Sequence, residues 1–428
     1  MTAASRPSLF ATETYRLDNG LQVVLAPDHS TPVVGVNLWY NVGSRNEREG
    51  KTGFAHLFEH MMFQGSAHVP KNVHFELIEK AGGSLNATTW FDRTNYFETL
   101  PAEDLELALW LESDRMGWMV EAMTEEKLEN QRDVVMNERR QRYDNQPYGD
   151  WDEQVQALLF PREHPYHHTV IGSMEDIKAA TLDDVRDFFS TYYLPNNAVL
   201  TLCGAFEKVR AMALVERYFG PVEAGAAPPP IPGTVDLPFT LGGRAHADVE
   251  ARVPLPRIYL ASRVPPFTTE EFYAGQAVVA AMGMGRSARL YDRLVRETRI
   301  AKSVSCHQLP LTSGATLFMV VATGYAHTDI DDLEGAVATE LEGLGDLAQS
   351  ELDRGVVGSE TRSIRELQQV SSRADFLSMF TTCFGDPDRL NRDIWRLRDV
   401  TLEEARAWSA SYLTPANRAV VRYIPEGS

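Results

Sequence analysis

Short runs of apolar and β-branched residues alternate along the chain with longer stretches of helical pattern. Residues 21–26, 33–42 and 85–100 are rich in β-branched and aromatic side chains, which predicts β-strands. Residues 54–63 and 124–143 have the pattern of helices. The first half is therefore expected to mix strands with long helices.

The second half has the same style of pattern. Residues 257–264 and 315–323 predict strands, and residues 270–282 predict a helix. Strands mixed with long helices are typical of an α+β fold in which helices pack against a mostly antiparallel sheet.

An internal repeat links the two halves. Thr181-Leu-Asp-Asp-Val-Arg is followed 220 residues later by Thr401-Leu-Glu-Glu-Ala-Arg, and the register extends to a Pro-Asn turn and an apolar run in both copies. Each copy predicts a helix with a threonine N-cap and carboxylates in its first turn, then a strand. Solenoid repeats have periods of only about 20 to 50 residues, so this spacing indicates two homologous domains from a duplication.

The boundary between the copies is rich in proline and glycine. Residues 220–233 read Gly-Pro-Val-Glu-Ala-Gly-Ala-Ala-Pro-Pro-Pro-Ile-Pro-Gly, which cannot continue a helix or a sheet. We therefore predict a first domain over residues 1–222, a linker over 223–236 and a second domain over 237–428. A chain of 428 residues is long enough for two cores.

Charge and composition narrow the choice of function. The net charge is −19, and no segment combines many Lys and Arg residues with aromatic ones, so nucleic acid is not an expected partner. The three cysteines are far apart, which indicates neither a disulfide framework nor a thiolate zinc site. No membrane partner is expected, and without a visible signal peptide we expect a cytoplasmic protein, a periplasmic one remaining an alternative.

The segment that indicates chemistry is Gly53-Phe-Ala-His-Leu-Phe-Glu-His-Met-Met-Phe63. His56 and His60 are four residues apart, so on a helix both imidazoles project from one face and can bind one metal ion. Glu59 lies next to them and can act as a base. This His-x-x-Glu-His order is known as the inverzincin signature. An isolated histidine pair is more often a hydrogen-bonded core pair, but the apolar surroundings here favour the metal site.

A catalytic zinc ion usually has three protein ligands and one open position, so a third ligand is needed. Glu138 is the best candidate, because it lies in a helical segment and shares a face with Val134 and Val135. The alternative is a solvated glutamate paired with Arg142.

With these motifs the chain resembles the pitrilysin, insulinase and mitochondrial processing peptidase family of inverted-motif zinc peptidases. In that family a glutamate about 80 residues after the motif completes the metal site, which matches Glu138. The resemblance covers most of the chain and includes the following segments: Leu17-Asp-Asn-Gly-Leu, Gly82-Gly-Ser-Leu-Asn-Ala-Thr, Asp92-Arg-Thr-Asn-Tyr, His164-Pro-Tyr and Gly285-Arg-Ser-Ala-Arg-Leu.

The resemblance implies a zinc metalloendopeptidase with Zn²⁺ as cofactor and Glu59 as catalytic residue. It also implies that two chains close into a clam-like chamber that admits unfolded peptides. Residues 84–89 resemble the edge strand to which a peptide substrate adds, and Asn86 and Ala87 are the implied peptide contacts.

Two positions depart from the family. Many relatives have a glutamate that supports the metal helix where this chain has Gln131, whose amide can still hydrogen-bond a ligand. Active single-chain relatives also have an Arg followed by a Tyr that clamp the substrate, whereas this chain has Arg296 without a following tyrosine. Lys302 and Ser303 are possible replacements.

Loss of a donor to the developing oxyanion typically costs about 10² to 10³ in rate. We therefore expect this chain to be the zinc subunit of a heterodimer, with a homologous subunit that supplies the Arg/Tyr pair. A self-sufficient homodimeric peptidase and a non-catalytic core-type subunit of a larger complex remain alternatives. A Gly-x-Gly-x-x-Ala match at 283–288 follows a predicted helix and so does not indicate a dinucleotide site.

Overall fold

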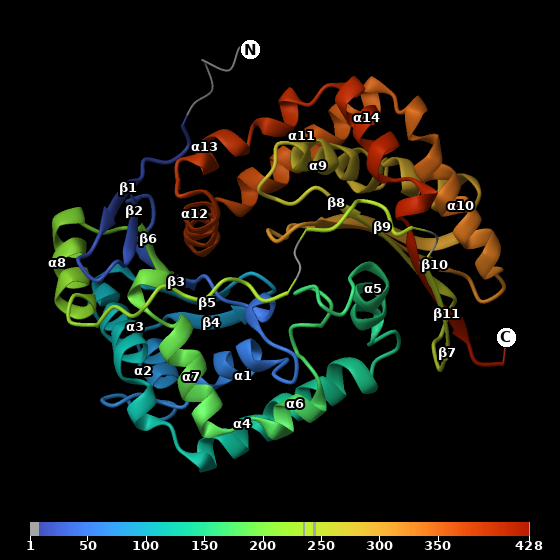
Figure 1. The fold of residues 1–428 in the computed structure, drawn as a ribbon. Coiled ribbons are helices and arrows are strands. Elements are labelled where there is room, and N and C mark those ends of the chain that lie inside the picture. Colours follow the sequence, from blue (N-terminus) through green and yellow to red (C-terminus); the bar gives the residue numbers. More distant parts are fainter. Residues whose placement is uncertain (1–7, 234–235, 243–244, 428) are drawn as a thin grey trace. The chain divides into compact units, whose positions relative to one another are not determined.

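The computed structural model describes residues 8–233, 236–242 and 245–427. Contacts between Cα atoms divide the chain into two compact units. The first unit contains Met1–Glu138, Thr169–Pro232 and Arg365–Arg392, and the second contains Arg139–His168, Gly233–Ile364 and Asp393–Ser428. Each unit has one sheet with helices packed against it (Figure 1).

The sheet of the first unit has six strands in the order β1-β2-β6-β3-β5-β4. Their bounds are Glu13–Arg16 (β1), Gln22–Pro27 (β2), Val33–Tyr40 (β3), Ser84–Thr89 (β4), Thr94–Pro101 (β5) and Ala198–Gly204 (β6). Strands β2 and β6 are parallel, and the other neighbours are antiparallel. All residues of β6 are buried, as expected for a central strand with both faces covered.

The sheet of the second unit repeats this arrangement. Its order is β7-β11-β8-β10-β9, again with one parallel pair, β7 and β11, and otherwise antiparallel neighbours. The bounds are Ala245–Ala251 (β7), Arg257–Val264 (β8), Ala301–Leu309 (β9), Thr316–Gly324 (β10) and Ala419–Pro425 (β11). Matched by position in the sheet and along the chain, β7, β8, β9, β10 and β11 correspond to β2, β3, β4, β5 and β6. The predicted α+β class with two related, mostly antiparallel sheets is therefore confirmed.

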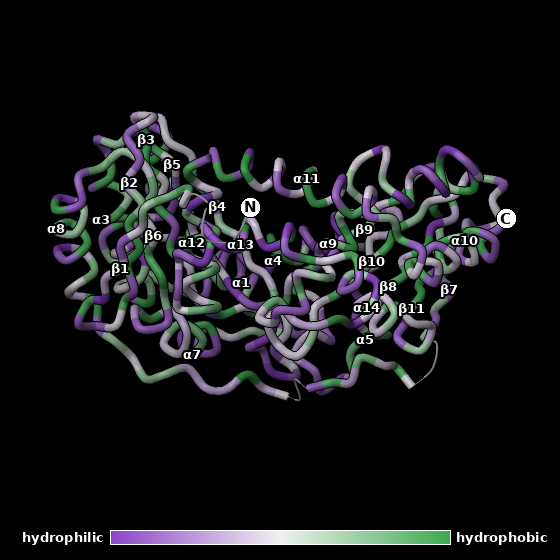
Figure 2. The backbone as a smooth tube through the Cα atoms, turned by 90° about the horizontal axis from the view of Figure 1, so that it is seen from above, coloured by the Kyte–Doolittle hydropathy of each residue, from purple (hydrophilic) through white to green (hydrophobic). Residues whose placement is uncertain are grey.

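The helices fall into the same two units. The first unit has α1 (Phe54–Met61), α2 (Val73–Lys80), α3 (Leu105–Trp118), α4 (Glu125–Arg139), α6 (Met174–Ala179), α7 (Leu182–Tyr192), α8 (Lys208–Phe219), α12 (Val370–Phe384) and α13 (Arg389–Asp393). The second has α5 (Trp151–Leu159), α9 (Glu271–Gly283), α10 (Ile330–Glu342), α11 (Gln349–Glu366) and α14 (Leu402–Tyr412). Hydrophobic positions, green in Figure 2, recur along the strands and helices of both units.

Two helices are exchanged between the halves of the sequence. Helix α12 belongs to the second half of the chain and packs on β3 and β6 of the first sheet (Figure 1). Helix α5 belongs to the first half and packs on β11 and β8 of the second sheet. The compact units are therefore discontinuous in sequence. These units do not test the domain boundaries predicted from the repeat, near residues 222 and 237, which stay a prediction.

The repeated helix starts have the predicted caps. Thr181 accepts a hydrogen bond from the backbone N–H of Asp184, and the side chain of Asp184 accepts from the backbone of Thr181. Thr401 and Glu404 form the same reciprocal arrangement in the second copy. These boxes satisfy amides that have no partner within the helix.

Two predicted elements have different bounds in the structure. The strand predicted over 85–100 is a hairpin of β4 and β5, closed by a hydrogen bond from the N–H of Trp90 to the carbonyl of Arg93. The turn contains no glycine or proline to mark it in the sequence. The helix predicted over 124–143 ends as an α-helix at Arg139 and continues as a π-helical turn over Arg140–Asp144.

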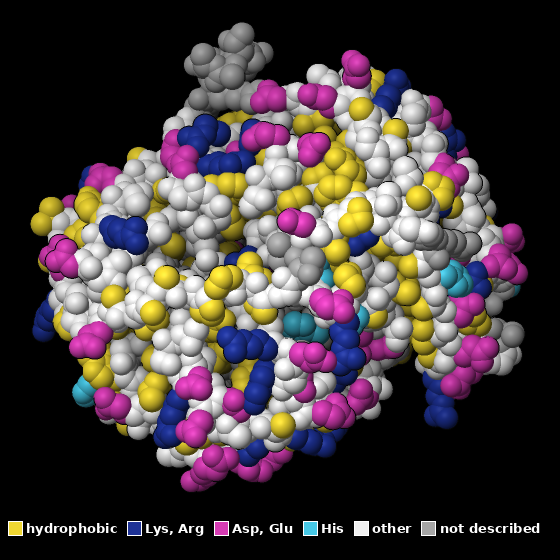
Figure 3. Space-filling model, viewed as in Figure 1, with side chains coloured by type: hydrophobic (Ala, Val, Ile, Leu, Met, Phe, Trp, Pro, Cys, Tyr) yellow, Lys and Arg dark blue, Asp and Glu magenta, His cyan; other side chains and the backbone are white. Residues whose placement is uncertain are grey.

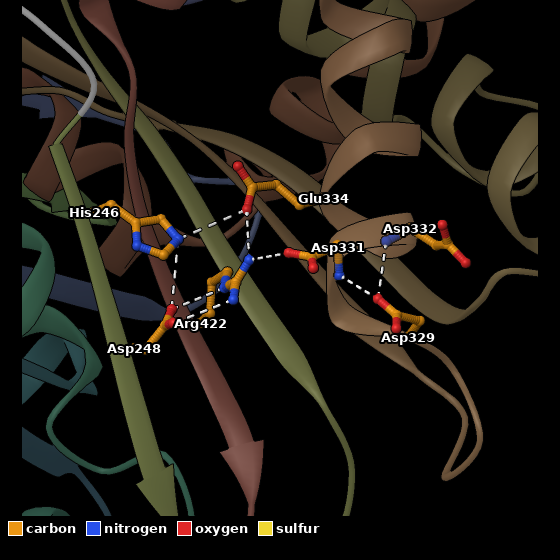
Figure 4. A network of polar contacts seen from close by, with 7 residues as sticks. All are labelled: His246, Asp248, Asp329, Asp331, Asp332, Glu334 and Arg422. Carbon is orange, nitrogen blue, oxygen red and sulfur yellow. Dashed lines mark hydrogen bonds and ion pairs between the residues drawn. The ribbon is translucent and has the colours of Figure 1, made fainter.

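A polar network fastens strand β7 at the edge of the second sheet (Figure 4). Arg422 on β11 forms two hydrogen bonds to Asp248 on β7, at 2.8 and 3.1 Å, and also pairs with Asp331 on α10. His246 on β7 lies 3.4 Å from Asp248 and 3.8 Å from Glu334. Arg422 therefore ties the edge strand to the adjacent helix.

The described part of the chain contains no helix long and apolar enough to cross a membrane. Its three cysteines, Cys203, Cys306 and Cys383, are free. On the face shown in Figure 3, basic side chains are interspersed with acidic ones.

Candidate metal centre

Helix α1 begins at an unusual N-terminus. Its N-cap residue, Gly53, has a φ of 84°, a left-handed conformation that favours glycine, and glycine has no side chain with which to cap the helix. The buried carboxylate of Glu47 takes this role by accepting hydrogen bonds from the N–H groups of Gly53 (2.9 Å) and Ala55 (2.7 Å). A negative charge at this end also complements the helix dipole.

The two histidines of α1 lie side by side. The ring centroids of His56 and His60 are 4.8 Å apart, with the ring planes at 78°. The apolar residues Leu57, Phe58 and Met61 bury the helix against the first unit. Hydrophobic packing therefore fixes the helix, and its i and i+4 positions present both imidazoles on the same side.

Glu138 comes from α4 and meets both histidines. One of its carboxylate oxygens lies 3.7 Å from Nε2 of His56 and 3.4 Å from Nε2 of His60. Three donor atoms, one from each residue, lie within 4.8 Å of one another. The structure thus brings together the three residues that the sequence predicted as metal ligands, although Glu138 is 78 residues from His60 in the sequence.

The donor set and its spacing fit a zinc ion. Two imidazole nitrogens and one carboxylate oxygen are typical ligands of a catalytic zinc site. Ligands at roughly 2.0 to 2.1 Å from a tetrahedral ion are about 3.3 Å apart, close to the observed 3.4 and 3.7 Å. The cluster therefore fits a cation between the donor atoms better than direct hydrogen bonds.

Glu59 is held beside this cluster by the end of β4. The hydroxyl of Thr89 donates a hydrogen bond of 2.6 Å to a carboxylate oxygen of Glu59. Burial raises the pKa of Glu59 above its ordinary value of 4.5, while the bond from Thr89 and the charges of His60 and Arg93 oppose this rise. A carboxylate whose pKa is raised is a better proton acceptor.

Comparisons with known proteins bear on this arrangement. Residues 22–164 match the model of the insulinase family, peptidase family M16, and residues 179–356 match the model described as the peptidase M16 inactive domain. A zinc protease of Helicobacter pylori, PqqE, is 32% identical over 375 residues, which cover 85% of this chain and 81% of the relative. This chain belongs to peptidase family M16.

Solved structures and more distant relatives agree with this membership. The crystal structure of a protease from Helicobacter pylori superposes with a TM-score of 0.90 at 29% identity and covers 97% of this M16 chain and 100% of that one. The mitochondrial-processing peptidase subunit beta of Saccharomyces cerevisiae is 26% identical over 277 residues, which cover 64% of this chain and 58% of the relative. The resemblance stated from the motifs is thereby confirmed.

The predicted peptide contacts lie on the edge strand of the M16 N-terminal sheet. Strand β4 is last in the strand order and pairs with β5 on one side. The side chain of Asn86 is exposed, and Ala87 is buried. Because Thr89, the last residue of β4, also contacts Glu59, this edge strand leads directly to the candidate centre.

The predicted supporting residue Gln131 is buried on α4, two turns before Glu138. Its side-chain nitrogen donates a hydrogen bond of 2.9 Å to Asn130. Its support of the metal helix stays a prediction.

The segment around Arg296, which lacks the tyrosine of the Arg/Tyr pair, lies in the second unit. Arg296 lies in the last turn of a π-helical segment, Tyr291–Glu297, and donates a hydrogen bond of 3.0 Å to Asp292, while Lys302 and Ser303 are exposed on the edge strand β9. Both side chains are therefore accessible, and their role as replacements stays a prediction.

Sequence reasoning missed two residues of this region, Glu47 and Thr89. Thr89 contacts Glu59 across 30 residues of chain, whereas Glu47 lies only six and eight residues before the amides that it caps. The glycine at the start of α1 was a usable signal, because a helix that begins at glycine needs its cap from elsewhere.

Proposed function

We propose that this chain is a zinc metalloendopeptidase that cleaves extended, unfolded peptides. In this proposal His56, His60 and Glu138 are the zinc ligands, and Glu59 is the general base. The observation that carries it is the convergence of these three donor atoms within 4.8 Å, with the carboxylate of Glu59 held beside them. The zinc proteases among the relatives support it.

The proposed chemistry divides between the cofactor and the protein. A bound zinc ion would polarise a carbonyl and lower the pKa of water toward about 7. Glu59 accepts the proton of the attacking water and transfers it to the leaving amine. Thr89 holds one oxygen of Glu59 at 2.6 Å, which leaves the other oxygen to exchange the proton.

Substrate binding is proposed to use strand β4. A peptide that pairs with this edge gains main-chain hydrogen bonds, which require an extended conformation but no particular sequence. Asn86 and Ala87 are the proposed contacts. Folded proteins present few extended segments with free main-chain groups, so this mode favours unfolded substrates, and two chains closing into a chamber would reinforce the selection.

We further propose that a homologous partner subunit supplies the Arg/Tyr pair that this chain lacks. The match of the mitochondrial-processing peptidase subunit beta, named as a subunit, supports a divided enzyme. A homodimer in which Lys302 or Ser303 replaces the tyrosine is the alternative.

The test is hydrolysis of a quenched, unstructured peptide by the purified chain loaded with zinc. Glu59→Gln is the blank, because it keeps the shape of the side chain and removes the base. In the sample that hydrolyses the peptide, with or without a partner subunit, we expect wild-type turnover to exceed that of the variant by about 10³-fold while zinc content stays equal. Measurable turnover that is equal in the two proteins would contradict the assignment of Glu59.

The same assay tests the partner. Glu59-dependent turnover by the chain alone would reject the need for a partner. Zinc binding without turnover, followed by turnover on mixing with a homologous chain that has the Arg/Tyr pair, would support the divided site. Absence of turnover in both samples would contradict the peptidase function.

A further inference from the structure

A second cluster of ionisable side chains lies in the core of the first unit, apart from the candidate metal centre. His74 comes from α2, Glu98 from β5, and Glu112 and Arg115 from α3. Their exposed fractions are 7%, 1%, 0% and 2%. Groups of this kind are rarely buried so completely unless they are paired.

Two carboxyl groups in this cluster face a single guanidinium. Glu112 forms an ion pair with Arg115. Glu98 contacts Nε2 of His74 at 2.5 Å, and its carboxyl group lies beside that of Glu112, with one oxygen of each within 4.8 Å. Two carboxyl groups can form a hydrogen bond only if one of them carries a proton. Among the described residues, Oε2 of Glu98 and Oε2 of Glu112 also have no partner if both groups are ionised.

His74, Glu98 and Glu112 offer donor atoms within 4.8 Å of one another, as a metal site would. The distances within the cluster argue against an ion. Zinc ligands in tetrahedral geometry are about 3.3 Å apart, whereas His74 and Glu98 are 2.5 Å apart, the length of a direct hydrogen bond. The candidate centre at α1, with 3.4 and 3.7 Å, shows the wider spacing.

The net charge of the cluster also argues against a bound metal ion. With Glu98 and Glu112 ionised and His74 neutral, Arg115 leaves one negative charge uncompensated in the core. A divalent cation would turn this into one positive charge, whereas a single proton makes the cluster neutral. An uncompensated charge at this depth is strongly unfavourable, so the proton is favoured over the metal ion.

We propose that Glu98 is a neutral carboxylic acid in the folded protein and that, with His74, Glu112 and Arg115, it forms a buried proton-binding site that braces the candidate metal helix. Glu98 donates its proton to the carboxylate of Glu112, and His74, itself neutral, donates from Nε2 to Glu98. The Oε2 atoms of Glu98 and Glu112 are then partners of each other, and the net charge is zero.

The direction of the pKa shifts agrees with one proton held by the two carboxyl groups. Burial raises the pKa of Glu98 from 4.5 to about 7 and lowers the pKa of His74 from 6.5 to about 3. Burial also raises the pKa of Glu112, the charge of Glu98 adds to this rise, and the charge of Arg115 opposes the rise in both carboxyl groups. These directions favour one proton on the pair, and the ion pair between Glu112 and Arg115 assigns that proton to Glu98.

The cluster reaches the candidate centre through Arg115. Its guanidinium lies over the ring of Phe63, which follows α1, at 5.0 Å, and over the ring of Tyr96 on β5 at 4.2 Å. Glu98 is directly opposite Leu85 of β4 in the sheet. The cluster thus joins the end of the metal helix to the hairpin that contains the proposed peptide strand.

The test compares Glu98→Gln with Glu112→Gln by thermal unfolding of the full chain at about pH 6, below the pKa of about 7 of Glu98. Glutamine mimics a neutral carboxylic acid, so Glu98→Gln is expected to melt within about 2 °C of the wild type. Glu112→Gln leaves Arg115 buried without a counter-charge and is expected to melt on the order of 10 °C lower. If Glu112→Gln does not fold, the melting temperature of Glu98→Gln relative to that of the wild type still tests whether Glu98 is neutral.

The pH dependence gives a second measurement. Charged and titratable groups that face the site are His74 (α2), Tyr96 and Glu98 (β5), Glu112 and Arg115 (α3), Tyr40 (β3) and Tyr193 after α7. The pKa of Glu98 is raised on folding. Its protonated form therefore stabilises the folded protein fully below pH 4.5, and this stabilisation is lost as pH rises through about 7. The pKa of His74 is lowered on folding, and this contribution is expected to be the same in the wild type and in Glu98→Gln. The melting temperature of Glu98→Gln should therefore rise relative to that of the wild type between these pH values.

Three outcomes would overturn the proposal. One is a Glu98→Gln variant that melts as low as Glu112→Gln or fails to fold. Another is a difference between Glu98→Gln and the wild type that does not change with pH. The third is zinc retained after dialysis by a His56→Ala, His60→Ala double variant and lost when Glu98→Gln is added, because this would make the cluster a metal site.

Discussion

The two units share a sheet and differ in what their helices offer. In both, five strands have the same order, with one parallel pair at the same place. In the first unit α1 and α4 bring two histidines and a glutamate together. In the second, α9 and α11 follow in the same order and contain no histidine. Shared architecture therefore does not imply shared chemistry, which depends on a few side chains.

Helix α9 contributes close helix packing to the second unit. It is rich in alanine and glycine, and a Cβ added at Gly275 would lie 2.5 Å from the ring of Trp408 on α14. The small residues thus permit close helix packing. The match of residues 179–356 to a domain described as inactive agrees with a structural role for these helices.

The largest expected effect is on zinc binding, which is proposed for the first unit and not for the second. Glu138→Gln removes the carboxylate that contacts both histidines and should weaken zinc binding by more than the roughly 10- to 100-fold typical of losing a residue that only supports a ligand. Zinc content after dialysis, measured by atomic emission, checks this. Glu129→Gln, an exposed position on the same helix, is the matched control. Equal zinc in both variants would remove Glu138 from the ligand set.

A smaller effect is expected where the edge strand meets the base. Thr89→Val keeps the shape of the side chain and removes the hydrogen bond to Glu59, so kcat should fall about 10-fold with KM and zinc content unchanged. Thr89→Ser keeps a hydroxyl and should retain most of the activity. A valine variant as active as the wild type would show that Glu59 does not depend on Thr89.

These contrasts also show how far sequence reasoning reached. The strands, the duplication and the threonine caps have local patterns, and the i, i+4 histidines define a metal-binding face by themselves. Glu138 needed the family resemblance, because helices far apart in sequence carry no mark of their contact. The exchange of α5 and α12 and the buried Glu98 cluster depend on tertiary packing and were not predicted. The cap from Glu47 was also not predicted, although Glu47 is only six residues from Gly53.

The smallest expected effect concerns the start of the metal helix. Glu47→Gln keeps a side-chain oxygen but removes the charge that accepts from Gly53 and Ala55, so we expect a loss of about 1 kcal/mol in the free energy of unfolding. Chemical denaturation of the zinc-free chain measures it, with Glu79→Gln, exposed on α2, as control.

Zinc binding extends the comparison between the two units. Because Glu47 orders the helix that presents His56 and His60, the zinc affinity of Glu47→Gln should fall by about as much as the unfolding free energy, roughly 5-fold for 1 kcal/mol. A loss of stability with zinc affinity unchanged would show that the cap supports the first unit as a whole and not the metal helix in particular. No counterpart of this coupling is expected in the second unit, where α9 starts after Glu270 and presents no ligand.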